Sequence, residues 1–293
     1  MSSAYDQLLD ATIRHLQELQ EHGARFVSVS PETLAALNKP APRPAKISSP
    51  PAPVAKPTFK PVEILATQTS LLPDVSEQTQ AAPALSPEAK AAAFAELRER
   101  ALACVKCPHL ASSRKNVVFG VGSIDAELMF VGEAPGADED MQGEPFVGKA
   151  GQLLTKIIQT MGFSRESVYI ANILKCRPDT PGQSAGNRKP TPDEMKTCIT
   201  YLHEQIDLIR PRVLVALGGT AMEGLLNKSG ITKLRGHWHT YRGIPLMPTY
   251  HPAYLLRNQA LSEKRKIWED MLQVMEKLGM NISEKQRKFF LRG

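Results

Sequence analysis

The 293-residue sequence contains only four cysteines, and it has neither a long apolar run nor a basic, apolar leader at its start. Four cysteines without a leader are a poor basis for a disulfide framework, so we expect metal binding or inert burial. A membrane span needs roughly 20 apolar residues in succession, and no segment approaches that length. These shortages argue against a secreted disulfide scaffold and a membrane-embedded protein, and they predict a cytoplasmic location with no membrane partner.

Acidic residues are also in the minority, because 36 lysines and arginines face 30 aspartates and glutamates. The resulting net charge of +6 favours a polyanionic partner, although charge alone identifies none. A hydrophobic content of 42% is enough for a packed core. The composition is therefore that of a basic globular protein, which we expect to be a monomer.

The chain divides into four parts by composition. Residues 1–38 form a small segment with helical spacing of its apolar residues, and its partner is unknown. Residues 39–85 are predicted to be a disordered linker, since the stretch 39–61 has eight prolines, five basic residues and no acidic residue. Residues 86–282 carry regular strand and helix patterns. Residues 283–293 are a basic tail that we expect to fray.

Strand and helix patterns alternate through residues 86–282, which is typical of βαβ units with right-handed crossovers. The prediction is an α/β fold, a three-layer α/β/α sandwich with a mostly parallel central sheet. Strands are expected at 116–119, 128–131, 168–174, 212–217 and 244–250, and helices at 86–103, 150–161, 192–209, 220–226 and 263–278.

The stretch from Leu128 to Leu154 is the one around which the rest is organised. Its first residues, Leu128 to Val131, are continuously apolar and end at a glycine, as a strand covered on both sides does. The segment that follows is rich in glycine, proline and carboxylates before helical spacing resumes near residue 150. Because ligands bind at the carboxyl ends of strands in open α/β sheets, we expect the chemistry in this loop.

Several motifs recur in an order that resembles a known family. They are Gly132-Glu-Ala-Pro-Gly136, Gly143-Glu-Pro-Phe-Val-Gly148, Asn172-Ile-Leu-Lys-Cys-Arg-Pro178 and Tyr250-His-Pro-Ala-Tyr-Leu-Leu-Arg257. Over residues 95–280 the chain resembles the family 4 uracil-DNA glycosylases, the iron–sulfur branch of that superfamily. The resemblance implies a DNA repair enzyme that flips uracil out of single- or double-stranded DNA and hydrolyses its N-glycosidic bond, leaving an abasic site for base excision repair.

The four cysteines are Cys104, Cys107, Cys176 and Cys198. A Cys-x-x-Cys pair can place two thiolates on one metal site, and the two remaining cysteines can meet it in space. The residues alone leave zinc, an iron–sulfur cluster and unliganded thiols open. The resemblance implies that all four bind a 4Fe–4S cluster, with zinc as the alternative. We expect a structural role for the cluster.

The resemblance also assigns roles around the base. His251 matches the histidine that donates a hydrogen bond to uracil O2, where negative charge grows as the base departs. Asn172 offers an amide that complements uracil O4 and N3–H, whereas cytosine presents the reverse pattern. Phe146 matches the aromatic residue that stacks on the extruded base. Glu139 matches the residue that crowds the C5 face and excludes the methyl group of thymine.

Water activation has weaker candidates. Relatives in another branch of the superfamily have an aspartate where this chain has Ala134, so no strong base stands there. Glu133 is predicted to bind the base or order the water, and Asn187 is an alternative for orienting it. Gly132 and Ala134 are predicted to line the substrate pocket. A dissociative transition state requires only a positioned nucleophile.

Contacts with DNA are predicted in two places. The segment Leu255, Leu256 and Arg257 resembles the wedge that fills the space left by a flipped nucleotide. Gly219 and Thr220 start a helix, where backbone N–H groups can hold a phosphate, although helix capping by Thr220 explains the pattern equally well. No lysine is placed to form a Schiff base, so we expect a monofunctional glycosylase without lyase activity.

Two other functions fit parts of the pattern. One is a module that binds uracil-containing DNA, or traps it covalently, without turnover. Some relatives that trap the base have an inserted basic loop ending in histidine, and the insertion at 180–186 has no histidine, which favours turnover. The other is a hydrolase of free nucleotides, which the wedge segment and the basic charge disfavour.

Overall fold

The computed structural model of the chain describes residues 85–179 and 187–291. These described residues belong to one compact unit. The predictions for the segment 1–38 and for the linker, apart from Leu85, lie outside the described residues. None of the helices in the described ranges is long and apolar enough to cross a membrane.

A six-stranded sheet forms the centre, in the order β1-β3-β2-β4-β6-β5. The four inner strands are parallel to one another, and the two edge strands pair antiparallel with their neighbours. The prediction of a mostly parallel sheet is therefore confirmed. The strands are β1 (Val121–Gly122), β2 (Leu128–Gly132), β3 (Tyr169–Asn172), β4 (Val213–Leu217), β5 (His239–Tyr241) and β6 (Ile244–Thr249).

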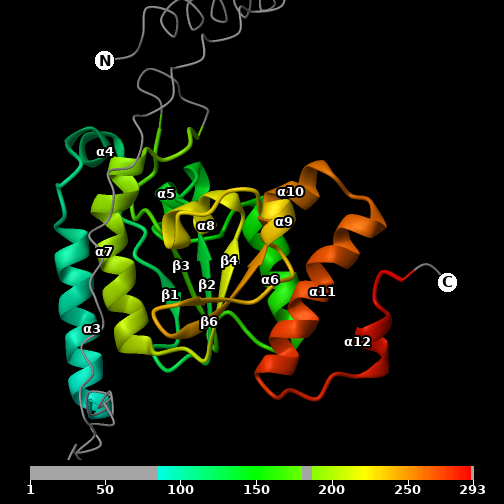
Figure 1. Ribbon diagram of the computed structural model, residues 1–293. Helices are drawn as coiled ribbons and strands as arrows, with labels where there is room; N and C mark the ends of the chain where they lie inside the picture. Colours follow the sequence, from blue (N-terminus) through cyan, green and yellow to red (C-terminus); the bar gives the residue numbers. More distant parts are fainter. Residues whose placement is uncertain (1–84, 180–186, 292–293) are drawn as a thin grey trace, which may run out of the picture. The chain divides into compact units, whose positions relative to one another are not determined.

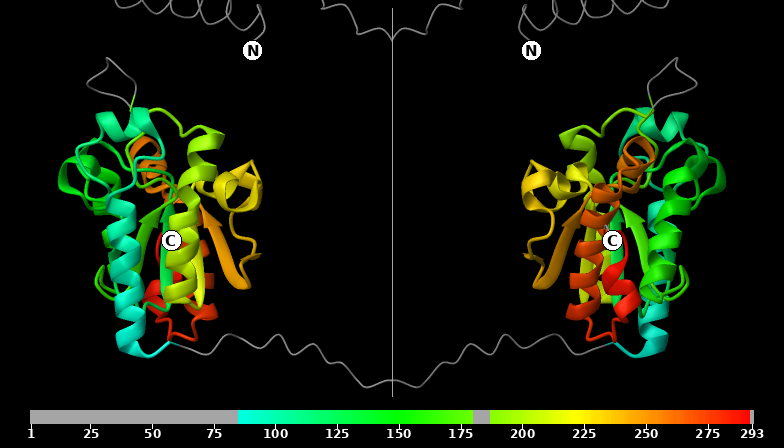
Figure 2. Two further views of the ribbon diagram at one scale, coloured as in Figure 1. Left: turned by 90° about the vertical axis from the view of Figure 1, so that its left-hand side faces the viewer. Right: turned by 90° about the vertical axis from the view of Figure 1, so that its right-hand side faces the viewer.

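Helices cover both faces of this sheet (Figure 1). On one face lie α7 and, packed alongside it, α3, which the rotated views of Figure 2 also show side by side. On the other face lie α6 and α11. The helices are α3 (Pro87–Leu102), α4 (Pro108–Ser113), α5 (Ala137–Gln142), α6 (Lys149–Met161), α7 (Pro192–Ile209), α8 (Gly219–Leu226), α9 (Ile231–Leu234), α10 (Pro252–Arg257), α11 (Leu261–Lys277) and α12 (Glu284–Lys288).

The inner strands are apolar throughout because both of their faces are covered. In β2, Val131 packs into the cluster formed with α7 and α8, while its neighbour Phe130 packs into the cluster formed with α6 and α11. Both side chains are fully buried. Burial of one such side chain contributes about 1.5–3 kcal/mol, so the two clusters together hold the three layers in contact.

The predicted helices are confirmed to within two residues at each end. Ser86 caps α3 by accepting a hydrogen bond from the backbone N–H of Ala89 at 3.2 Å. Thr191 and Glu194 form a capping box at the start of α7, and α6 ends at Gly162 with φ +97°. These ends agree with the sequence because capping is a local property of a few residues.

The strand predicted at 116–119 is wrong, since the edge strand β1 begins at Val121. Val118 donates its backbone N–H to Lys175 O at 2.7 Å, and the Phe119 carbonyl accepts from the Gln205 side chain at 3.0 Å. The segment is apolar because it is buried, and its backbone bonds outside a strand ladder. Gly120, with φ +143°, then turns the chain into β1.

Strand β5 was not predicted. It forms a hairpin with β6 through Arg242 and Gly243, whose φ angles are +50° and +78°. Two successive residues with positive φ make the two-residue turn that suits a twisted hairpin. Arg242 is not a typical residue for that conformation, so this turn has little local signature in the sequence.

The prediction of a frayed C-terminal tail is wrong for its described part. Helix α12 forms there, and Trp268 donates its indole N–H to Gln286 O at 2.6 Å. Phe289 packs on Trp268 with a ring-centroid distance of 5.6 Å. The prediction considered only the basic charge of the tail and overlooked Phe289, which anchors the tail on α11.

The site is expected along the edge of the sheet that is formed by the carboxyl ends of its parallel strands. The carboxyl ends of β2, β3, β4 and β6 meet at this edge, and α5, α8 and α10 follow β2, β4 and β6 there (Figure 1). Ligands of open α/β sheets bind in this position.

Candidate functional site

Asn172, Phe146 and His251 come together around Gly132 at the end of β2. Gly132 is the register partner of Asn172. A methyl group at Gly132 would lie 2.3 Å from Asn172 Oδ1 and 2.6 Å from Phe146 Cζ, so only a glycine fits between them. The rings of Phe146 and His251 are tilted by 32° with centroids 5.6 Å apart. Residues widely separated in the sequence thus share one small region.

The amide of Asn172 has an open acceptor. Its side chain is 2% exposed, and Oδ1 is buried without a hydrogen-bond partner in the part of the chain that the structure describes. An unpaired buried acceptor costs about 1–3 kcal/mol. Such an atom is satisfied when a ligand presents an N–H group to it, which makes Asn172 the strongest ligand-binding candidate.

His251 is held as a neutral hydrogen-bond donor. Its Nδ1 accepts the backbone N–H of Ala253 at 3.1 Å, as the cap of α10, so the ring proton sits on Nε2. Burial, together with the nearby Arg257 charge, lowers the pKa of His251 from 6.5 to about 4. The imidazole is therefore uncharged at neutral pH and offers one N–H to a ligand.

Glu139 braces the loop that carries Phe146. One carboxylate oxygen accepts the backbone N–H of Gly136 at 3.0 Å, and the other accepts those of Val147 and Gly148, each at 3.0 Å. Hydrogen bonds to a charged acceptor are about twice as strong as neutral ones. The contact predicted between Glu139 and the C5 face of a base stays a prediction, whereas the brace is what the structure contains.

Two residues, Asn187 and Glu133, are the candidates for orienting the water. Asn187 accepts a hydrogen bond from Arg177 Nε at 2.9 Å, and its amide nitrogen would be 3.2 Å from a methyl group at Gly136. Glu133 is half-buried at the end of β2, and its carbonyl accepts the backbone N–H of Leu174 at 3.1 Å. Asn187 and Glu133 thus flank the loop that begins at β2.

Ala134 packs against the core cluster on the α7 side of the sheet. It is half-buried and carries no polar atom in its side chain. That Ala134 lines the substrate pocket stays a prediction.

The predicted wedge divides into an anchor and two exposed residues. Leu255 is 5% exposed and packs with Tyr250 and Ile267, and its contact with DNA stays a prediction. Leu256 is 41% exposed, and Arg257 is exposed beside it at the end of α10. The apolar anchor holds α10 while its neighbours face outward.

Gly219 and Thr220 lie half-buried in the first turn of α8. The cap of this helix is Gly218, and no side chain caps it, so the alternative in which Thr220 acts as the cap is not observed. The first backbone N–H groups of α8 are therefore not taken up by a side-chain cap.

The four cysteines line a single cavity of about 20 Å³. Cys104 and Cys107 lie between α3 and α4, Cys176 follows β3, and Cys198 belongs to α7. Arg114 donates to Cys176 Sγ at 3.1 Å. The cavity therefore joins segments that are far apart in the sequence.

The thiols occupy an unusual environment. The Lys175 backbone N–H donates to Cys198 Sγ at 3.2 Å, yet burial raises the pKa of the Cys198 thiol to about 12. Within residues 85–179 and 187–291, no three His, Cys, Asp or Glu side chains are grouped so that they could hold a single metal ion. The four cysteines therefore share one cavity.

Two buried polar residues near the site were missed by the sequence reasoning. Lys175 Nζ donates to the Asn172 carbonyl at 3.0 Å and to Gln205 Oε1 at 2.7 Å. Burial lowers the pKa of Lys175 to about 7. A lysine next to an apolar strand was the available signal, whereas Gln205 looked like an ordinary helical residue.

Arg165 was also missed. It donates to the carbonyl groups of Pro145 and Phe146 at 2.8 Å and 3.1 Å. It lies in a loop between α6 and β3, where a charged residue attracts no notice. Only the three-dimensional structure shows that it reaches the loop of Phe146.

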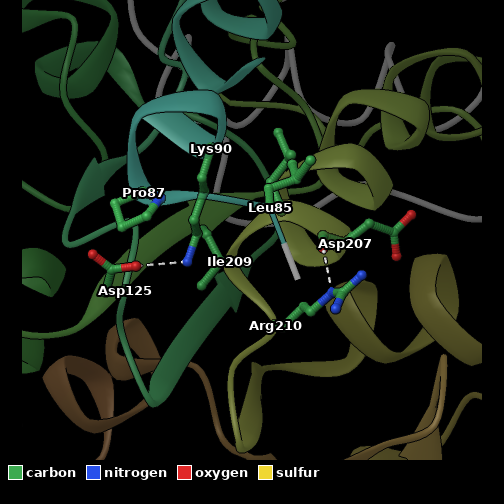
Figure 3. Close-up of a pocket in the computed structure, with 8 residues that line it drawn as sticks. Leu85, Pro87, Lys90, Asp125, Asp207, Ile209 and Arg210 are labelled. Carbon is green, nitrogen blue, oxygen red and sulfur yellow. Dashed lines mark hydrogen bonds and ion pairs between the residues drawn. The ribbon is translucent and has the colours of Figure 1, made fainter. Parts of the chain in front are cut away.

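A separate pocket of about 190 Å³ lies away from this region (Figure 3). It is lined by residues that precede β2 and β4, so it sits at the amino ends of the strands. Within it Lys90 pairs with Asp125 at 2.7 Å. Since the ligand-binding edge of the sheet is the opposite one, this pocket is not part of the candidate site.

Comparison with known proteins matches the chain to the same family that its motifs resemble. The family model of the uracil DNA glycosylase superfamily matches residues 119–272. The type-4 uracil-DNA glycosylase of Thermotoga maritima is 46% identical over 179 residues, covering 59% of this chain and 88% of the relative. That of Sulfurisphaera tokodaii is 40% identical over 208 residues, covering 68% and 90%. That of Saccharolobus solfataricus is 43% identical over 185 residues, covering 60% and 82%.

These matches show that the chain is an α/β protein of the uracil DNA glycosylase superfamily. The strands and helices that the structure describes agree with that assignment. Within that superfamily, the chain belongs to the type-4 uracil-DNA glycosylases. The resemblance drawn from its motifs is confirmed.

The protonation state of His251 can be checked directly by NMR. Because its pKa is lowered from 6.5 to about 4, we expect its ring signals to keep the neutral form until the pH falls towards 4. The unfolded chain binds this proton at higher pH, so His251 also makes folding less favourable as the pH falls from 6.5. The variant His251→Gln identifies the signal, and a midpoint at or above 6.5 would contradict the buried, neutral ring.

The brace made by Glu139 predicts a loss of stability in Glu139→Gln. A glutamine has one acceptor oxygen and an NH₂ group, so at least one of the three backbone N–H groups loses its partner. We expect a decrease of about 1–3 kcal/mol in the free energy of unfolding, measured by urea denaturation. The matched control is Glu144→Gln, at an exposed position of the same loop. Equal stability of the two variants would refute the brace.

Proposed function

We propose that this chain excises uracil from DNA by hydrolysing the N-glycosidic bond and leaving an abasic site. The observation that carries the proposal is the open acceptor of Asn172 beside the neutral Nε2–H donor of His251 and the ring of Phe146, in a type-4 uracil-DNA glycosylase chain. Asn172 is buried, His251 is half-buried, and both are fixed before any ligand enters. Such preorganised groups give selectivity and transition-state stabilisation together.

Asn172 distinguishes uracil from cytosine. Its Oδ1 accepts the N3–H of uracil, and its NH₂ group donates to O4. Cytosine has an acceptor at N3 and a donor at C4, so it would leave buried groups unpaired at a cost of about 1–3 kcal/mol for each group. The burial of the unpaired Oδ1 supports this assignment.

His251 stabilises the departing base. As the glycosidic bond breaks, positive charge develops on the sugar and negative charge on the base, chiefly at O2. The Nε2–H of a neutral imidazole donates to that oxygen and strengthens its hydrogen bond as the charge grows. Phe146 stacks on the base and keeps its ring plane aligned with both polar groups.

The water that attacks C1′ needs only to be positioned, because the transition state is dissociative. Glu133 and Asn187 flank the loop after β2, and either side chain can orient this water. The apolar wall at Ala134 supports a mechanism without a strong base at that position. Leu256 and Arg257 would contact the DNA beside the extruded nucleotide, and the backbone of Gly219 and Thr220 would hold a phosphate.

A 4Fe–4S cluster is the cofactor that best fits Cys104, Cys107, Cys176 and Cys198. Four thiolates are the usual ligand set of such clusters, and the four residues line one cavity. Zinc requires all four sulfur atoms about 2.3 Å from a single ion, whereas a cluster distributes them over separate iron atoms. The cluster would supply a structural link between α3, β3 and α7. The cytoplasmic location and the monomeric state stay predictions from the sequence.

The function is tested with an oligonucleotide containing a single uracil, followed by treatment with alkali. We expect cleavage at uracil and none at thymine or cytosine in matched oligonucleotides. A stable protein–DNA adduct in place of cleavage would indicate the trapping module. Release of uracil from the free nucleotide alone would indicate the nucleotide hydrolase, and either result would overturn the proposal.

Asn172→Ala and His251→Ala should each lower the single-turnover rate of uracil removal by about a hundredfold or more, as loss of one oxyanion-type donor does. The matched controls Asn281→Ala and His237→Ala alter exposed residues and should leave the rate unchanged. Activity of both site variants within a few-fold of the unmodified chain would refute the assigned roles.

Removal of the cluster should lower the melting temperature. For a domain of this size about 3 kcal/mol corresponds to roughly 6–12 °C, which calorimetry resolves. Iron content and visible absorption report the cluster before and after chelation or oxidation. A metal-free variant with serine at Cys104, Cys107, Cys176 and Cys198 that melts and reacts like the unmodified chain would remove the structural role.

A further inference from the structure

The loop carrying Phe146 is held by charges on both sides. On one side Glu139 accepts the N–H groups of Val147 and Gly148, both at 3.0 Å. On the other side Arg165 donates from Nη2 to the Pro145 carbonyl at 2.8 Å and from Nη1 to the Phe146 carbonyl at 3.1 Å. Four backbone polar groups between residues 145 and 148 are thus bound by one carboxylate and one guanidinium.

Phe146 needs such support because its backbone is strained. Its φ angle is +55°, in the left-handed region that L-residues with large side chains rarely adopt. A conformation of this kind persists only where the surroundings impose it. The side chain is nevertheless buried, with 6% exposure, and directed towards Gly132 and His251.

The Phe146 carbonyl is also pressed against α6. A methyl group at Gly151 would lie 1.8 Å from Phe146 O, so the two backbones approach as closely as a glycine permits. Arg165 Nη1 donates to Thr155 Oγ1 at 3.2 Å as well as to the Phe146 carbonyl. Arg165 therefore ties the strained residue to the first turns of α6.

We propose that Arg165 is a positioning residue that fixes the Phe146 ring as one wall of the base pocket. This role rests on the proposed function and extends it to a residue outside the pocket. Arg165 touches neither the base nor the reacting atoms. Without it, the loop keeps only the support of Glu139, so Phe146 relaxes towards negative φ and its ring leaves its place beside Gly132 and His251. The stacking face for the base is then lost, while Asn172 and His251 remain in place.

The geometry requires an arginine. A guanidinium presents N–H groups in a rigid, planar fork, so two of its nitrogen atoms reach two carbonyl groups and a hydroxyl together. A lysine offers one flexible ammonium that cannot hold all three acceptors in this arrangement. Arg165→Lys should therefore be intermediate between the unmodified chain and Arg165→Met.

The test compares Arg165→Met and Arg165→Lys with the unmodified chain on uracil-containing oligonucleotide. The matched control is Arg212→Met, which removes an exposed ion pair with Glu127 of 3.0 Å at the amino end of β4. Inhibition by free uracil measures the stacking wall without the chemistry. Base–aromatic stacking implies that the inhibition constant of uracil rises about tenfold in Arg165→Met, less in Arg165→Lys, and not in the control.

A general loss of structure is separated from a specific one by a double-mutant cycle with Phe146→Leu. If Arg165 acts through the ring, Arg165→Met should change the inhibition constant by less than about twofold when Phe146 is already leucine. The same tenfold change in both backgrounds would overturn the role of Arg165, as would an unchanged constant in the single variant. Arg165→Lys provides the cycle with a second variant that retains the charge.

Failure of the proposed function gives a different result. If the unmodified chain does not release uracil, the proposed function is overturned. If it does release uracil, and free uracil inhibits the unmodified chain and Arg165→Met equally, only the role of Arg165 is overturned.

Discussion

The close approach of β2 and β3 at Gly132 is the constraint on which the site depends. Because residue 132 has no side chain, the Asn172 amide and the Phe146 ring both reach the space where a Cβ would stand. A side chain at residue 132 would occupy this space and keep the two groups out of it. Here the missing side chain brings them into one pocket, and His251, from the end of β6, closes it. The arrangement of the pocket therefore depends on the absence of a Cβ atom at residue 132.

The parts of the fold that could be predicted are those with local causes. The strand at 128–131 and the helices at 150–161 and 192–209 follow from apolar spacing and from caps such as Thr191. Asn172 and His251 were predicted as site residues from the family resemblance, and the structure brings both of them close to Phe146. Periodicity and capping are encoded within a few residues, so a single sequence reveals them.

What could not be predicted depends on contacts between distant segments. The residues 116–119 look like a strand, but their carbonyl and N–H groups bond to Gln205 and Lys175 from other elements. Leu255 and Leu256 are identical in type, yet one anchors α10 and the other is exposed. The reach of Arg165 to the Phe146 loop has no sequence signature at all. In each case the missing information is which segments meet.

The side chain of Lys175 has a consequence for how this domain can vary. Its ammonium holds the Asn172 carbonyl, while its own backbone N–H points at Cys198 Sγ and the next residue is Cys176. Lys175 therefore connects Asn172, the proposed base-binding residue, directly to the cavity lined by the four cysteines. An insertion or deletion between Asn172 and Cys176 would displace one of these residues from its site, so changes in chain length should be tolerated only outside this segment.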